Sequence, residues 1–177
     1  MQLSQWFALL GSIIFGAFWT FLIQNVLLQL FANIIAGSGM IWQNFIDLGS
    51  SPAFTVLWVG CNIALLLWMF ITWNARPKGS SEVRRMQPLW WLASSILVVF
   101  GWLCLGTFLV FKWQITGASP SPGGTDLFFP VPPGGWLILM LFVLIDVIVL
   151  FWLPTLLATP RTYRFVVPGA VTLLGSR

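Results

Sequence analysis

The sequence has no histidine and very little charge. Among its 177 residues, 8 are Lys or Arg and only 4 are Asp or Glu, so charged residues make up 7% of the chain. A soluble domain carries roughly 25% charged residues, because its surface must be hydrated. Twelve charged side chains cannot cover the surface of a water-soluble domain of this size. The scarcity of charge therefore excludes a soluble globular protein.

The missing residue types also narrow the chemistry. Without histidine there is no Ser-His or Cys-His catalytic base, no histidine-ligated haem and no histidine metal site. The two cysteines, Cys61 and Cys104, form no CxxC pair and no disulfide framework. Phosphate-binding glycine loops and nucleophile motifs are absent from the sequence. We therefore expect a protein that is not an enzyme and predict no cofactor or metal, while a bound lipid or pigment stays undetermined.

Apolar residues are abundant, at 59% of the chain. A helix needs roughly 20 consecutive apolar residues to cross the hydrocarbon core of a bilayer. Four stretches meet this requirement, at residues 5–25, 53–73, 89–111 and 135–157. Their apolar runs are continuous, whereas the strands of a membrane barrel alternate. The sequence predicts an all-α integral membrane protein in which residues 1–177 form a single membrane domain with four transmembrane helices.

The basic residues predict the orientation of these helices. The segment 74–88 holds Arg76, Lys78, Arg84 and Arg85, and the tail 158–177 holds Arg161, Arg164 and Arg177. With four spans, both segments lie on the side of the N-terminus, and only Lys112 falls on the other side. The positive-inside rule then predicts a multi-pass protein with both termini in the cytoplasm. The net charge of +4 is thus explained by topology and does not indicate nucleic acid. These residues either set the topology alone or also attract lipid headgroups.

Tryptophans support the same spans. Eight of the twelve lie at or near the predicted span ends, where aromatic belts form in membrane proteins. They are Trp6, Trp42, Trp73, Trp90, Trp91, Trp113, Trp136 and Trp152.

Two segments between the spans have distinct compositions. Residues 26–48 are apolar but dotted with polar side chains, which favours an interfacial helix lying along the membrane over a continuation of the first span. Residues 114–134 are rich in proline and glycine and predict an irregular outer loop. This loop either rests on the membrane or docks to a partner. The candidate docking residues are Phe128, Phe129, Pro130, Pro132 and Pro133.

Asp146 is the one ionisable acid or base within any predicted span. A charge near the centre of the bilayer is costly, so the side chain is expected to face the bundle interior and to be paired or protonated. Asn62 lies at a similar depth in the second span and is the expected hydrogen-bond partner. We interpret this pair as structural, with a proton- or cation-coupling site as the alternative.

The first span carries a row of small residues at intervals of four. Ala8, Ser12, Gly16 and Thr20 fall on one helix face, where they allow another helix to approach closely. The row predicts a helix-packing surface, either within this chain or with another protein.

Three classes of function follow from this composition. The leading hypothesis is a non-enzymatic accessory, scaffold or assembly subunit that binds membrane lipids and other membrane protein subunits. The second is a small transporter or channel component that uses Asp146 as its coupling group. A membrane enzyme is the least favoured class, because so few acid–base groups are present.

Overall fold

The computed structural model describes residues 3–36, 51–74, 80–116, 133–170 and 173. These residues are helical almost throughout and form no strand. The helical elements are α1 (Leu3–Phe18), η1 (Trp19–Ile23), α2 (Gln24–Ala36), α4 (Ser51–Asn74), α5 (Ser80–Thr116), α6 (Pro133–Val147), η3 (Ile148–Trp152), α7 (Leu153–Ala158) and η4 (Arg161–Val166). Because α1, η1 and α2 follow one another without a break, we call them together the first helix; α6, η3 and α7 likewise form the fourth helix.

Four helices are long and apolar enough to cross a membrane. Their membrane-length stretches are Trp6–Leu28, Pro52–Asn74, Met86–Thr107 and Leu137–Ala158. The prediction of an all-helical chain with four such helices is therefore confirmed for the described residues.

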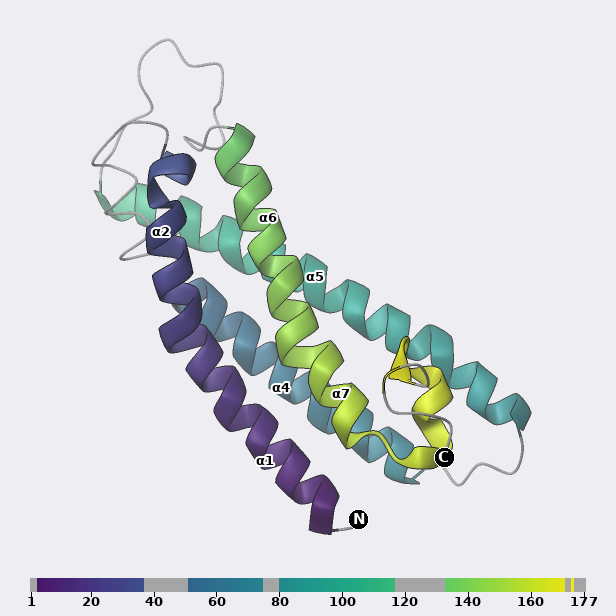
Figure 1. Ribbon diagram of the computed structural model, residues 1–177. Helices are drawn as coiled ribbons and strands as arrows, with labels where there is room; N and C mark the ends of the chain where they lie inside the picture. Colours follow the sequence, from purple (N-terminus) through teal and green to yellow (C-terminus); the bar gives the residue numbers. More distant parts are fainter. Residues whose placement is uncertain (1–2, 37–50, 75–79, 117–132, 171–172, 174–177) are drawn as a thin grey trace.

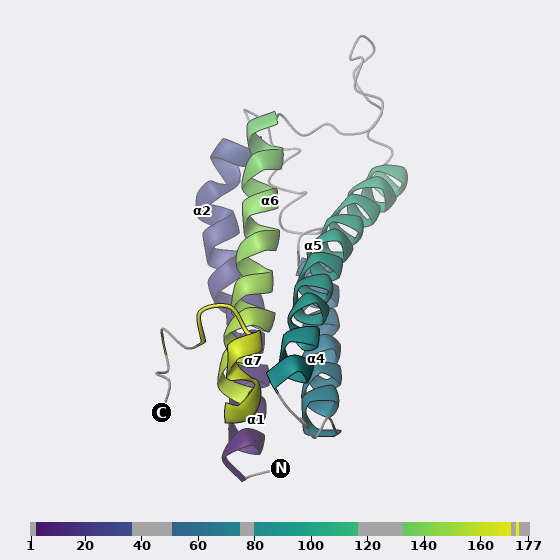
Figure 2. The same ribbon diagram turned by 90° about the vertical axis from the view of Figure 1, so that its right-hand side faces the viewer.

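The helices alternate in direction along the chain (Figure 1). The first helix packs against α4 and the fourth helix, while α5 packs against α4 and α6 on the other side (Figure 2). Consequently the start of α1, the end of α4, the start of α5 and η4 lie at the same end of the bundle. The core contains Leu57, Cys61 and Leu97 from α4 and α5, together with Val143 and Phe151 from the fourth helix.

The described part of the expected interfacial helix 26–48, residues 26–36, is not a separate element. Residues up to Ala36 continue the first helix, which is the alternative that the sequence also allowed. The physical reason is that no glycine or proline interrupts the chain between Trp19 and Ala36, so the helical hydrogen bonds carry on. Residues 37–48 lie outside the described part of the chain.

The predicted cytoplasmic loop 74–88 is shorter than expected, because α5 already begins at Ser80. Glu82, Arg84 and Arg85 are good helix formers, and Pro88 removes one hydrogen bond near the start of a 37-residue helix. At its other end α5 reaches Thr116, into the predicted outer loop 114–134. Residues 75–79 and 117–132 lie outside the described residues.

The predicted tail 158–177 folds back onto the bundle in its described part, up to Ala170. After α7 the chain turns through η4, which lies beside α5 (Figure 1). Tyr163, Val166, Val167 and Ala170 are each at most 2% exposed and belong to the main core cluster. Burying these apolar side chains against the helices fixes a segment that has no membrane-length run of its own.

Glycines mark two close helix contacts. A Cβ built on Gly16 of α1 would lie 2.8 Å from Nε1 of Trp58 in α4, and one built on Gly101 of α5 would lie 2.7 Å from Cγ1 of Val143 in α6. Both distances are too short for a larger side chain, so glycine allows these helices to approach.

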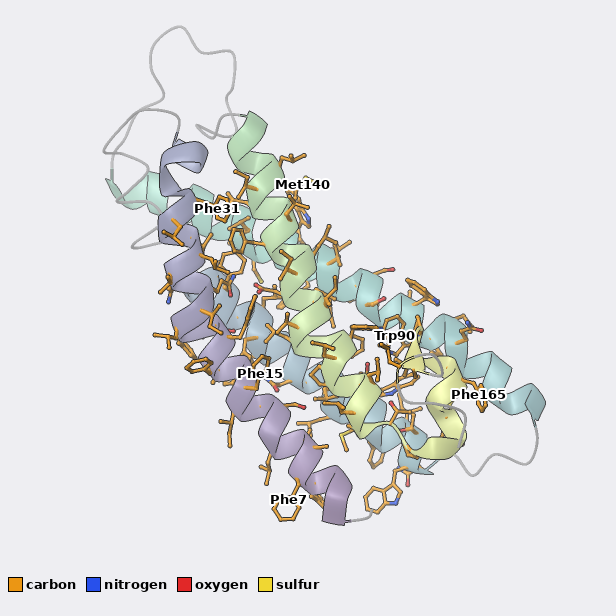
Figure 3. The ribbon with its side chains drawn as sticks, viewed as in Figure 1. Phe7, Phe15, Phe31, Trp90, Met140 and Phe165 are labelled. Carbon is orange, nitrogen blue, oxygen red and sulfur yellow. The ribbon has the colours of Figure 1, made fainter. Side chains whose placement is uncertain are left out.

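The tryptophans divide into two groups. Trp6, Trp73 and Trp91 are about half exposed near the ends of their spans, in keeping with a belt position. Trp90 is only 3% exposed and stacks on Phe151, with ring centroids 5.9 Å apart (Figure 3). Trp90 thus lies near the start of its span as predicted, but its indole packs between α5 and the fourth helix instead of facing outward.

Candidate functional site: a buried carboxylate between two helices

The carboxylate of Asp146 is the centre of a buried polar cluster. Asp146 lies near the end of α6 and is 0% exposed. Nε1 of Trp19 donates a hydrogen bond to Oδ1 at 2.8 Å, and Nε2 of Gln24 donates one to Oδ2 at 2.8 Å. Each carboxylate oxygen thus accepts an N–H from the first helix, and the acid joins the first helix to the fourth.

A π-helical turn allows both donors to reach the same carboxylate. Trp19 and Gln24 are five residues apart, which in an α-helix would separate their directions by about 140°. In η1 the backbone N–H of Gln24 bonds to the carbonyl of Trp19, the i→i−5 bond of a π-turn. This wider turn places the side chains of residues five apart on the same helix face, as residues four apart are placed in an α-helix. The extra residue in the turn therefore accounts for the double contact with Asp146.

A second π-turn follows Asp146 on the fourth helix. In η3 the backbone N–H of Leu153 bonds to the carbonyl of Ile148. Pro154, the next residue, has no N–H and would clash with the carbonyl four residues before it in a regular helix. Widening the preceding turn relieves that clash. Both helices that meet at Asp146 thus carry a π-turn beside it, an arrangement that often marks functional sites.

Three buried polar atoms of the first helix and α4 have no hydrogen-bond partner among the described residues. They are Oγ1 of Thr20, Oε1 of Gln24 and Nε1 of Trp58. Thr20 and Gln24 are only 3% and 0% exposed. Because an unpaired polar atom is costly in an apolar interior, these atoms are the most unusual feature of the bundle.

Asp146 has no basic residue at its depth. All eight Lys and Arg residues lie outside the four membrane-length stretches. The donors that face the carboxylate are therefore neutral N–H groups, which can orient a carboxylate without cancelling a charge on it.

Asn62, the predicted partner of Asp146, does not fill that role. Its Nδ2 donates to the backbone carbonyl of Trp58, one turn earlier on its own helix, at 2.8 Å. Short amide side chains in helices commonly bond to the preceding turn. Similar positions along their helices thus did not bring the two side chains together, because such a position does not determine which helix faces meet.

The small-residue row of the first helix faces the interior of this chain. Gly16 and Thr20 are buried, while Ala8 and Ser12 are half-buried and Oγ of Ser12 bonds to the backbone carbonyl of Ala8. Gly16 lies against Trp58 and Leu150. The row therefore brings the first helix close to α4 and the fourth helix, and it continues into Thr20 and Gln24 of the polar cluster.

A second polar cluster, which the sequence did not indicate, joins two helices, α4 and α5, to the end of the fourth helix. Nε1 of Trp68 donates to Oγ1 of Thr159 at 3.0 Å, and Nε1 of Trp90 donates to Oγ1 of Thr155 at 3.2 Å. The indole of Trp152 donates to the backbone carbonyl of Pro168 at 2.9 Å, which fastens the tail. The pattern of Thr155 and Thr159 one turn apart is the only sequence signal for it.

The remaining predicted residues are only partly described. Arg84 and Arg85 lie in the first turns of α5, and Arg161 and Arg164 lie in η4 at the same end of the bundle. Pro133 begins α6. Outside the described residues lie Arg76, Lys78, Phe128, Phe129, Pro130 and Pro132.

No family model, curated protein or solved structure matches this chain.

The chemistry of the site therefore rests on its geometry alone. The described residues contain no group of three or more His, Cys, Asp or Glu side chains that could hold a metal ion. What the cluster offers is one carboxylate between two N–H donors, together with the unpaired amide oxygen of Gln24. Such a set can fasten two helices together or provide oxygen ligands to a cation.

Proposed function

We propose that this protein is a non-enzymatic accessory or assembly subunit of a larger membrane complex. The proposal rests on one observation: both carboxylate oxygens of Asp146 accept hydrogen bonds from the first helix. The acid is thereby engaged in holding the bundle together, as are the indoles of Trp68 and Trp90. The bundle thus turns these polar groups inward, where they hold its helices together.

The outward faces of the outer helices support this proposal. Only 17% of the first span and 22% of the third is buried inside the chain. Phe7, Ile14 and Phe18 form an exposed apolar stripe along the first helix, and Phe7 projects away from the bundle (Figure 3). Such a surface accommodates lipid chains and the helices of other subunits equally well.

We further propose that both termini lie in the cytoplasm. Arg84 and Arg85 start α5 at the same end of the bundle as Arg161 and Arg164, whereas Lys112 lies toward the opposite end of α5. The positive-inside rule assigns the arginine-rich end to the cytoplasm.

The assembly proposal can be tested with steric variants on the two outward faces. Ile14 and Val99 are 70% and 57% exposed on the first helix and α5. Ile14→Trp and Val99→Trp would obstruct a helix that packs there, while Ile14→Leu and Val99→Leu serve as matched controls. We expect one tryptophan variant to lose a stoichiometric subunit after mild detergent extraction, without a change in its own unfolding temperature. The proposal is wrong if the wild-type chain purifies alone and its deletion alters no membrane complex.

A second candidate function, a small transporter or channel component, is favoured by one specific observation. Oε1 of Gln24, on the amide that bonds to Asp146, and Oγ1 of Thr20, one turn earlier on the same helix, are buried oxygens with no partner among the described residues. Hard cations bind to oxygen ligands of these kinds. In reconstituted vesicles, this function requires a proton or cation flux that Asp146→Asn abolishes while the fold is kept. A subunit role instead requires no such flux from the wild-type chain.

A further inference from the structure

The turn η4 has three distinct faces. In a 3-10 helix, residues three apart lie directly above one another. Tyr163 and Val166 therefore share one face, and both are buried, at 2% and 1% exposed. Arg161 and Arg164 share a second face, and Phe165, which is 62% exposed, lies on the third. The buried face fixes the turn on the bundle, and the register places the two arginine positions and Phe165 on the other two faces.

The position of this turn is held by several contacts. The backbone N–H of Tyr163 bonds to the carbonyl of Pro160 at 2.9 Å, and the indole of Trp152 bonds to the carbonyl of Pro168 at 2.9 Å. Val167 beyond the turn is also buried. Arg161 and Arg164 are thus carried on a fixed segment rather than on a free tail.

The same end of the bundle gathers further positive charge. The turn η4 lies beside α5, whose first turns carry Arg84 and Arg85 immediately before the membrane-length stretch that starts at Met86. Of the four acids in the chain, only Glu82 lies in the described residues at this end. The described backbone therefore places four arginines and one acid at the boundary of the apolar stretches.

Arginines together with an exposed phenylalanine at the end of an apolar helix suit a phospholipid as the binding partner. Arginines at the edge of a membrane attract lipid phosphate groups, and an exposed aromatic side chain beside them inserts among the acyl chains. Arg161 and Arg164 occupy one face of the turn and Phe165 the adjacent one, at the depth where the fourth helix has just ended. A protein partner would not require the apolar and basic faces to lie at this boundary.

We propose that η4 and the first turns of α5 form a binding site for the headgroups of anionic phospholipids. In this site Arg161 and Arg164 bind the phosphates together with Arg84 and Arg85, and Phe165 anchors the turn in the lipid. The site goes beyond the proposed subunit role and does not depend on it, because it requires only the chain and its surrounding lipid.

The test uses the full chain in nanodiscs that contain phosphatidylcholine and phosphatidylglycerol. Native mass spectrometry of the protein released from them gives the ratio of the two lipids that it retains. Each arginine near an anionic membrane surface increases the affinity for anionic lipid roughly fivefold. We expect Arg161→Gln with Arg164→Gln to lower the preference for phosphatidylglycerol by about 25-fold. The Arg84→Gln and Arg85→Gln pair, on a different element, should give a comparable loss.

Two controls distinguish a local site from a general charge effect. Lys112→Gln removes a positive charge toward the opposite end of α5 and should leave the lipid preference unchanged. Arg161→Lys with Arg164→Lys keeps the charges and should retain the preference. The proposal is overturned if Lys112→Gln lowers the preference as much as the arginine pairs, or if neither arginine pair lowers it. It is also overturned if soluble inorganic phosphate displaces the retained lipid, because the ligand would then be a free anion.

Discussion

At the scale of single residues, the structure gives Asp146, the acid within the fourth apolar helix, a specific structural role. The carboxylate of Asp146 accepts one hydrogen bond from Trp19 and one from Gln24, and both donors belong to the first helix. In a bilayer each hydrogen bond between helices contributes about 0.6 kcal/mol, and up to about 1.7 kcal/mol. One carboxylate with two such bonds is therefore a substantial part of the contact between the first and fourth helices.

We expect Asp146→Leu to lower the free energy of unfolding by about 1–3 kcal/mol, because it removes two bonds between helices and leaves two N–H donors unpaired. Asn62→Leu is the matched control, since Asn62 bonds only to its own helix and should change stability little. Unfolding measured by steric trapping in bicelles gives both values. Equal losses in the two variants would contradict the role of Asp146.

The sequence could locate Asp146 but not its partners. An isolated acid in an apolar span is conspicuous, and its burial follows from the cost of exposing it to lipid. The choice between Asn62 and Gln24 depends on how the helices are rotated about their axes. That rotation is determined by packing, for example by Gly16 against Trp58, and is not encoded in the depth of a residue.

At the scale of the secondary-structure elements, the π-turn η1 is the feature that sets the geometry of the site. A π-turn is equivalent to one residue inserted into an α-helix, so the segments on either side keep their faces when that residue is removed. Here the inserted residue turns Trp19 toward the same carboxylate as Gln24.

Deletion of Phe21, an exposed residue within η1, should therefore be tolerated better than deletion of an exposed residue in regular helix. We expect the Phe21 deletion to remain folded and to lose little stability, because Trp19 and Gln24 then lie four residues apart in a regular α-helix, where both still face Asp146. Deletion of Leu10 in α1 should be far more disruptive, since it rotates the preceding residues by about 100° and turns Leu9 out of the core. Thermal unfolding in detergent compares the two deletions. Similar losses would contradict the assignment of η1 as an inserted residue.

Prediction from sequence was reliable for the spans and less so for their ends. Long apolar runs determine the four helices, because backbone groups in lipid must bond within the helix. The extension of α5 to Ser80 and of the first helix to Ala36 lies in polar-dotted sequence, where composition does not distinguish helix from loop. The folded tail was missed for a different reason: Tyr163 and Val166 are buried by tertiary contacts, and their spacing of three is too short a pattern to recognise.

At the scale of the whole molecule, the distribution of basic residues fits the alternating directions of the four helices. Arg84 and Arg164 belong to distant parts of the sequence, yet the fold places their segments at one end, while Lys112 lies toward the other. An even number of crossings gives this separation, and it supports the proposal that the arginine-rich end faces the cytoplasm.

The most direct test of four crossings is labelling of single cysteines from one side of a sealed membrane. The variants Arg84→Cys, Arg164→Cys and Lys112→Cys, made after replacing Cys61 and Cys104 with alanine, would react with a membrane-impermeant maleimide only on the side where each residue lies. Four crossings predict that positions 84 and 164 react from the cytoplasmic side and position 112 from the opposite side. Labelling of positions 84 and 164 from opposite sides would contradict this architecture.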